Sequence, residues 1–196
     1  MIKYHTSDNM AENKEVEMLK EKLFDKKENG WKFVKNADEI FNYANSYMDF
    51  MNKSKTERKI IKSSKQIADN KGFKDINDME NLKPGDKVYY INRDKSMYLA
   101  IIGKEDISKG LNIIGAHADS PRLDLKPNPL YEDGGFAYFK THYYGGIKKY
   151  QWTTIPLSIH GVIVKANGEK VEVNIGEDDK DPIFTITDLL PHLAQD

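Results

Sequence analysis

The chain has 196 residues, a formal net charge of −1 and no cysteine. This length allows one or two domains with a buried core, and 39% hydrophobic with 11% aromatic residues argues against a disordered polyelectrolyte. The lack of cysteine excludes a disulfide scaffold, a thiol nucleophile and every cysteine-based zinc site, so His, Asp and Glu are the strong metal ligands available. The near-zero net charge gives no overall attraction to nucleic acid or to an anionic membrane.

The distribution of apolar residues predicts neither a membrane-spanning helix nor a secretory signal peptide. No apolar run approaches the roughly 18 residues that a membrane span needs, and no apolar signal region follows residues 1–5. We therefore expect a cytoplasmic protein without a membrane or nucleic-acid partner.

The first third of the chain has the periodicity of amphipathic helices. Apolar residues recur every three to four positions over residues 12–28, which predicts a first helix. Asn36, followed three residues later by Glu39, forms a capping box that predicts a second helix. Ser54 and Glu57 form another capping box, which predicts the start of a third.

The third predicted helix, which Gly72 ends, carries most of a strongly basic segment. Residues 52–74 hold eight Lys or Arg residues against two acidic ones. Such a surface could bind a polyanion, but solvated helix faces commonly carry Lys, and no aromatic residues interleave here as stacking platforms. We interpret the segment as a solvated helix face, and nucleic-acid binding is the least favoured alternative.

Short apolar runs then replace the helical periodicity. Residues 87–91, 97–102 and 111–116 predict three strands separated by polar turns. The third run is uninterrupted, which is typical of a strand buried on both faces in the sheet of an α/β domain. His117 follows its carboxyl end, the edge of an open α/β sheet where ligand sites collect.

After Pro121 the sequence predicts a second, mostly β unit. Pro and Gly residues punctuate short aromatic runs such as residues 136–139. Further strands are predicted over residues 153–156, 157–165 and 170–175. Asn167-Gly168 is a hairpin signal that joins the last two, and residues 187–195 begin a short helix that Pro191 interrupts.

One short motif could carry chemistry. His117 and Asp119 lie two residues apart at the end of the apolar run. The imidazole could bind a metal while the carboxylate orients a neighbouring group. Taken alone, the pattern favours a simpler interpretation, a histidine held by local hydrogen bonds in a strand-to-loop turn.

Four segments resemble a known family in the same order. Residues 113–123 resemble the metal-binding segment of the aspartyl aminopeptidase and aminopeptidase I family, whose usual form is His-Thr-Asp-Ser-Pro. Residues 144–152, 155–160 and 175–185 resemble later segments of that family, so the resemblance runs from about Leu82 to the end. Ala118 stands where the family has Thr, which affects only fine positioning because that residue is not a ligand.

The resemblance implies a metallopeptidase that removes N-terminal residues, often acidic ones, from peptides with a pair of zinc ions. In that case His117 is a metal ligand, and Asp119 orients it or its surroundings in the catalytic site. His160 belongs to an inserted domain and reaches substrate in a neighbouring subunit's site. An equally favoured alternative is a strand histidine satisfied within a β layer. The remaining histidines are expected to be structural: His5, His142 and His192.

The resemblance also implies the fold class, an α/β zinc-peptidase-like domain interrupted by a mostly β inserted domain. Residues 1–121 would be the N-terminal part of the peptidase domain and residues 122–196 the first part of the inserted oligomerisation domain, both incomplete. The family's other metal ligands and its general base lie further downstream, so we expect the chain alone to be inactive.

Two consequences follow from an incomplete sheet. Strands without neighbours expose edges and apolar faces, so we expect self-association, and the resemblance implies a homo-oligomer. The alternative is a complete, catalytically inactive homologue that acts as an assembly or interaction module.

Overall fold

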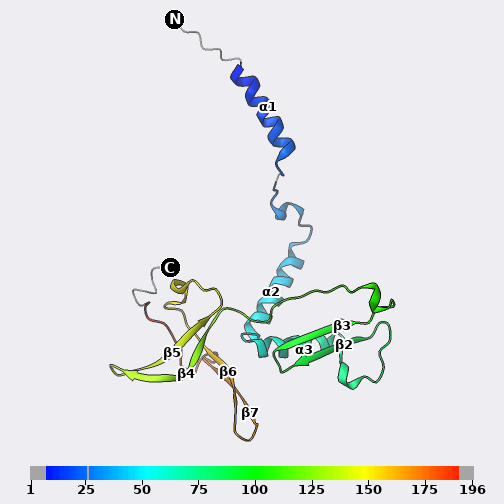
Figure 1. Cartoon of the computed structure of the whole chain (residues 1–196). Coiled ribbons are helices and arrows are strands. Elements are labelled where there is room, and N and C mark those ends of the chain that lie inside the picture. Colours follow the sequence, from blue (N-terminus) through cyan, green and yellow to red (C-terminus); the bar gives the residue numbers. More distant parts are fainter. Residues whose placement is uncertain (1–7, 26, 190–196) are drawn as a thin grey trace. The chain divides into compact units, whose positions relative to one another are not determined.

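The computed structural model of the chain describes residues 8–25 and 27–189 (Figure 1). The chain forms two compact units, Met1–Ser46 and Tyr47–Asp196. In the first unit, helix α1 (Asp8–Leu23) and a short 3-10 helix (Gly30–Phe33) precede the start of α2 (Ala37–Lys53). No helix in the described parts of the chain is long and apolar enough to cross a membrane.

The first two helices were predicted with unequal accuracy. Helix α1 begins four residues and ends five residues earlier than predicted, which shows that apolar periodicity alone does not fix the ends of a helix. Helix α2 begins where predicted. The Asn36 side-chain oxygen accepts a hydrogen bond of 3.1 Å from the Asp38 N–H, and its amide donates one of 3.0 Å to Glu39. The Asn36 cap therefore fixes the helix start.

Helix α3 (Glu57–Asn70) is capped by a different residue from the one predicted. Thr56, not Ser54, is the N-cap, and its hydroxyl accepts a hydrogen bond of 3.4 Å from the Lys59 N–H. Ser54 is instead buried, with 2% exposure, and its hydroxyl donates a hydrogen bond of 2.9 Å to Ser63. The predicted end is confirmed, since Gly72 follows the helix with a φ of +80°.

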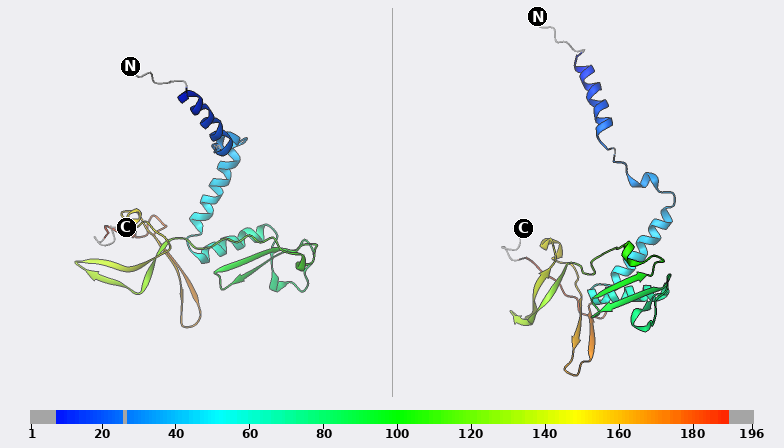
Figure 2. Two further views of the ribbon diagram at one scale, coloured as in Figure 1. Left: turned by 45° about the horizontal axis from the view of Figure 1, so that its top comes forward. Right: turned by 45° about the vertical axis from the view of Figure 1, so that its right-hand side comes forward.

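The core of the second unit lies between α3 and a three-stranded sheet (Figure 2). Strand β1 (Lys74–Asp75) is parallel to β2 (Lys87–Asn92), and β2 is antiparallel to β3 (Ser96–Ile101). The positive φ values of Arg93 and Asp94, 53° and 57°, fit the tight turn that joins β2 to β3. The buried apolar side chains are Ile61, Ala68, Val88 and Tyr89.

Two antiparallel hairpins follow the sheet. Strand β4 (Arg122–Asp133) pairs with β5 (Phe136–Tyr144), and β6 (Ile159–Val164) pairs with β7 (Lys170–Ile175). The second hairpin confirms the prediction from Asn167-Gly168, since Gly168 has a φ of +83°. Residues 153–157 were predicted as strand but form only isolated bridges, at Thr153 and Leu157.

The predicted strand over residues 111–116 is wrong for this chain. The segment is extended without strand pairing, and Ile113 and Ile114 are 82% and 99% exposed. A strand needs a neighbour for its backbone hydrogen bonds, and none of the described segments supplies one. The fold class is confirmed as a mixture of helix and sheet. The predicted boundary at residues 121/122 and the inserted domain stay predictions.

The last predicted helix has little overlap with the described residues. Residues 187–189 are not helical. Its remaining residues, 190–195, lie outside the described part of the chain.

Candidate metal and substrate site

His117 lies at the end of the extended segment, just before β4, and its ring is fixed by Asp119. Its Nδ1 lies 2.9 Å from the Asp119 carboxylate oxygen Oδ1 and 2.9 Å from the Asp119 backbone oxygen. Because both oxygens only accept hydrogen bonds, Nδ1 must carry the proton and donate. No described residue bonds Nε2, and the side chain is 82% exposed. The free lone pair of the ring therefore faces solvent.

Asp119 is in turn held by Tyr144 at the end of β5. The Tyr144 hydroxyl donates a hydrogen bond of 2.6 Å to the second carboxylate oxygen, Oδ2. Hydrogen bonds from Tyr144 and from His117 stabilise the ionised carboxylate, so they lower the pKa of Asp119 below its usual value. The same bond raises the pKa of Tyr144. Asp119 is thus ionised and uses one oxygen for each neighbour.

The pairing of β4 with β5 brings Tyr144 close to Asp119. Tyr144 pairs with Arg122, and the Arg122 guanidinium lies 4.0 Å from the centre of the Tyr144 ring. Arg122 also forms ion pairs with Glu57 at 2.9 Å and with Asp124 at 2.7 Å. Arg122 and Tyr144 lie within the segments that resemble the family, but no local pattern assigns them a role, because their contact joins residues more than 20 positions apart.

Gly145 permits the close approach of these segments. Its φ is +80°, and a Cβ there would lie 3.4 Å from the Cα of Pro121. Residues with a side chain rarely adopt this φ, so the backbone conformation favours glycine here, where the chain lies in van der Waals contact with Pro121. The glycine therefore allows the chain after Tyr144 to pass directly beside the chain after Asp119.

The His117 and Asp119 pair fits one side of a zinc site. Metal-binding histidines commonly donate their second ring N–H to a carboxylate, which sets the tautomer and ring orientation. Imidazole and carboxylate are also ligands that zinc accepts. Within residues 8–25 and 27–189, however, no three His, Asp or Glu side chains are placed to hold a metal ion together.

His160 has the opposite environment. It lies on β6 with a side-chain exposure of only 8%, and both ring nitrogens have partners. Nδ1 lies 2.7 Å from the Lys59 ammonium, which only donates, so Nδ1 accepts. Nε2 therefore carries the proton and lies 2.9 Å from Glu177 and 2.7 Å from the Ser158 hydroxyl. Burial, and then the Lys59 charge, lower the pKa of His160.

Ser158, His160 and Glu177 resemble the members of a nucleophilic triad, but their geometry excludes that role. The Ser158 hydroxyl donates to Glu177 at 2.8 Å. Glu177 contacts Nε2 of His160, the same ring nitrogen that Ser158 contacts, whereas the carboxylate of a triad contacts the opposite ring nitrogen. His160 therefore cannot act as the base for Ser158, because its Nε2 carries a proton and its Nδ1 accepts from Lys59. Hydrogen bonds from Ser158 and Lys55 lower the pKa of Glu177 to about 2. The trio is a charged, hydrogen-bonded support for β6 and β7.

The basic segment is also less solvated than predicted. Lys55, Lys59 and Lys62 contact Glu177, Asn174 and Glu172, at 3.1, 3.2 and 3.0 Å respectively. Part of the basic segment is thus a packing surface for the β6–β7 hairpin.

His142, the remaining histidine among the described residues, takes no part in either cluster. The ring of His142 stacks on Tyr143, with ring centres 5.7 Å apart. His5 and His192 lie outside the described residues. The predicted structural role of His5, His142 and His192 stays a prediction.

Comparisons with known proteins agree with the resemblance seen in the sequence. A family model described as aminopeptidase I zinc metalloprotease (M18) matches residues 50–196. The "Probable M18 family aminopeptidase 1" of Borrelia garinii subsp. bavariensis is 51% identical over 170 residues, 86% of this chain and 37% of that protein. The protein of the same name from Clostridium acetobutylicum is 51% identical over 166 residues, 83% of this chain and 36% of that protein.

Solved structures give the same result. The crystal structure of aminopeptidase I from Borrelia burgdorferi B31 matches with a TM-score of 0.78 and 47% identity, over 84% of this chain and 41% of that one. The M18 family aminopeptidase from Thermotoga maritima matches with a TM-score of 0.77 and 46% identity, over 88% of this chain and 38% of that one. The chain therefore spans less than half the length of these relatives.

Proposed function

Since the chain belongs to the aminopeptidase I zinc metalloprotease (M18) family, we propose that it supplies one part of a zinc-dependent aminopeptidase site. The observation that carries the proposal is the free, exposed Nε2 of His117 opposite a carboxylate-held Nδ1. In this proposal His117 is a metal ligand, Asp119 orients it, and the substrates are peptides with a free, often acidic, N-terminal residue.

His117 would hold a zinc ion here, and that ion would supply Lewis-acid chemistry at neutral pH. The residues of this chain contribute position and charge. Asp119 keeps the imidazole in one tautomer and makes it a stronger donor, while Tyr144 and Arg122 hold Asp119 in turn. We propose a site of two zinc ions whose other ligands come from a segment beyond these residues. The 196 residues alone are then inactive.

His160 is proposed as the substrate contact. Both of its nitrogens have partners in the chain, so contact with a substrate requires Nδ1 to leave Lys59 or Nε2 to leave Glu177. The apolar and aromatic side chains exposed on β4 and β5 support a homo-oligomer. The same exposure favours the second candidate, an inactive assembly module. A cytoplasmic location completes the proposal.

A chimaera tests this function. The chain replaces the matching segment of the Clostridium acetobutylicum relative, and hydrolysis of aspartyl-, glutamyl- and leucyl-p-nitroanilide is measured with and without a zinc chelator. We expect hydrolysis that the chelator stops and zinc restores, and that His117→Gln abolishes because Gln is a poor zinc ligand.

The control is His142→Gln, which removes a histidine outside both clusters and leaves hydrolysis intact. A soluble chimaera that is inactive while the unmodified relative is active contradicts the proposal and favours the assembly module. Full activity of the His117→Gln variant contradicts the assigned metal ligand.

A further inference from the structure

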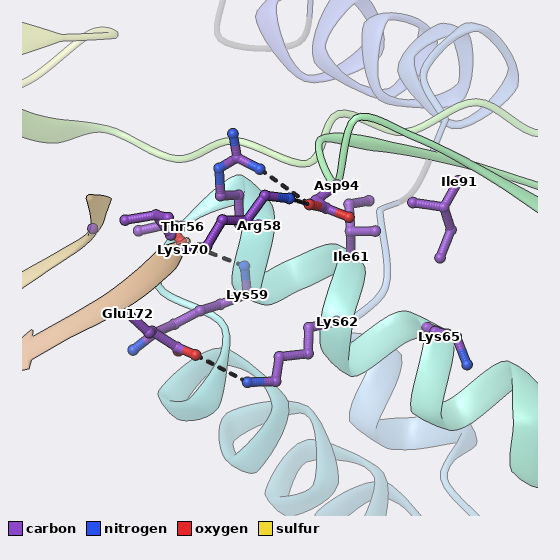
Figure 3. Close-up of a pocket in the computed structure, with 12 residues that line it drawn as sticks. Thr56, Arg58, Lys59, Ile61, Lys62, Lys65, Ile91, Asp94, Lys170 and Glu172 are labelled. Carbon is purple, nitrogen blue, oxygen red and sulfur yellow. Dashed lines mark hydrogen bonds and ion pairs between the residues drawn. The ribbon is translucent and has the colours of Figure 1, made fainter. Parts of the chain in front are cut away.

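A basic pocket lies apart from the His117 segment. Its volume is about 310 Å3, and it is lined by residues between 56 and 65 at and after the start of α3, by β2 and the β2–β3 turn, and by the β6–β7 hairpin (Figure 3). Five lining side chains are cationic, and two are carboxylates. The cations are Arg58, Lys59, Lys62, Lys65 and Lys170, and the carboxylates are Asp94 and Glu172.

The two carboxylates do not neutralise these cations. Arg58 at 3.4 Å and Lys170 at 2.7 Å share Asp94, as Figure 3 shows. Glu172 pairs with Lys62 at 3.0 Å. Lys65 also pairs with a carboxylate outside the lining, Asp69, at 2.7 Å. The surplus of positive charge that remains comes from Lys59 and from the two cations that share Asp94, and it attracts an anion.

Lys59 is the cation with the poorest compensation. Its ammonium contacts two neutral acceptors, Nδ1 of His160 and the side-chain oxygen of Asn174, and none of the described carboxylates forms an ion pair with it. Burial lowers the pKa of Lys59 below its usual value. An anion in the pocket would compensate this partly desolvated charge.

The start of α3 and the apolar lining residues indicate which chemical groups the ligand carries. Thr56, the N-cap of α3, lies at the rim, and the positive end of the helix dipole favours negative charge there. Ile61, Ile91 and Val162 give the pocket an apolar part. Several cations around a partly apolar cavity suit a compact molecule with more than one negative group.

We propose that this pocket binds a small organic polyanion, with phosphate or carboxylate groups on a compact carbon framework, through Lys59, Arg58 and Lys170. The proposal goes beyond the peptidase function. The cations repel the α-ammonium group of a peptide, so the pocket is not the place where a substrate's N-terminus binds. A ligand here would bridge three segments of the chain and stabilise them together.

The binding test uses the 196-residue chain with inorganic pyrophosphate and with citrate, at an ionic strength held constant with sodium chloride. We expect saturable heat release with one site per chain and a melting temperature raised by about 3 °C near saturation. Binding of pyrophosphate alone identifies a phosphorylated ligand, and binding of citrate alone identifies a polycarboxylate. Binding of neither, or unsaturable binding at many sites, overturns the proposal.

Two lysines of the same hairpin provide a matched comparison. Lys170 lines the pocket and pairs with Asp94, whereas Lys165 lies outside the pocket and pairs with Glu169 at 3.1 Å. We expect Lys170→Gln to weaken binding about tenfold and Lys165→Gln to change it less than about twofold. Equal weakening by both variants means diffuse charge attraction and overturns the proposal.

Variants on α3 complete the test. Lys59→Gln should weaken binding at least about tenfold, since it removes the cation with no carboxylate partner. Circular dichroism of the ligand-free variant shows whether it folds. If it does not, Arg58→Gln replaces it, because Arg58 belongs to the proposed ligand set and its side chain is 34% exposed. Unchanged affinity in the folded variant overturns the proposal.

Discussion

The two histidines that the sequence singles out have opposite surroundings. His117 is exposed, with Nδ1 held by Asp119 and Nε2 free. His160 is buried, with Nδ1 bonded to Lys59 and Nε2 shared by Glu177 and Ser158. The comparison teaches that a histidine's availability depends on which nitrogen its neighbours occupy, and this is a tertiary property.

The largest expected effect concerns the carboxylate that orients His117. In the chimaera, Asp119→Asn should lower zinc affinity or peptidase kcat by roughly 10- to 100-fold, because the neutral amide holds the ring and its charge less well. Tyr144→Phe removes only the hydroxyl that donates to Asp119 and should have a smaller effect in the same direction.

Tyr143→Phe is the matched control, the same change one position earlier, where the side chain points to the other face of β5. Zinc titration and steady-state kinetics give both readouts. Equal effects of Tyr143→Phe and Tyr144→Phe, or no effect of Asp119→Asn, would contradict the assigned support of His117.

For the stability of the chain, we expect His160 to contribute more than His117. His160→Ala should lower the free energy of unfolding by about 1–3 kcal/mol, because it removes a side chain that is only 8% exposed together with its hydrogen bonds to Lys59 and Glu177. His117→Ala should change it by less than about 0.5 kcal/mol, since that side chain is exposed. Urea unfolding of the 196-residue chain measures both. A larger loss for His117→Ala would mean that the two environments are wrongly assigned.

The protonation of His160 should have a smaller effect on the free energy of unfolding. The pKa of His160 is lowered in the folded chain, from a usual value of 6.5, so below that pH the unfolded state binds more protons than the folded state. The free energy of unfolding should therefore be full above pH 6.5 and fall as the pH drops toward the lower folded value. The fall between about pH 7.5 and pH 5.5 should be smaller in His160→Gln, which cannot titrate there. An identical fall in both proteins would contradict the lowered pKa.

Local signals in the sequence predicted much of the fold. The Asn36 cap, the end of α3 at Gly72 and the hairpin at Asn167-Gly168 each depend on residues within a few positions of one another. Such interactions are encoded by neighbouring residues, although the Ser54 and Glu57 pattern shows that another local residue, Thr56, can take the cap instead. Residues 111–116 failed as a strand because strand pairing needs a distant neighbour, which no local pattern supplies.

Local reasoning reached the contact within the candidate site but not its support. The local hydrogen bond between His117 and Asp119 follows from their spacing of two residues and is present, while their roles in a metal site stay a prediction. The sequence could not reveal Tyr144 and Arg122 as their support, nor Lys59 as the partner of His160, 101 positions away. Those contacts arise from the β4–β5 register and from the packing of α3 against the second hairpin.

The tautomers of the two rings test the central claim most directly. Long-range 1H–15N correlation spectra of the 196-residue chain, assigned with His117→Gln and His160→Gln, distinguish a proton on Nδ1 from one on Nε2. The account predicts opposite forms near neutral pH, with the proton of His117 on Nδ1 and the proton of His160 on Nε2. A proton on Nε2 of His117 would block the nitrogen assigned to the metal and contradict the account.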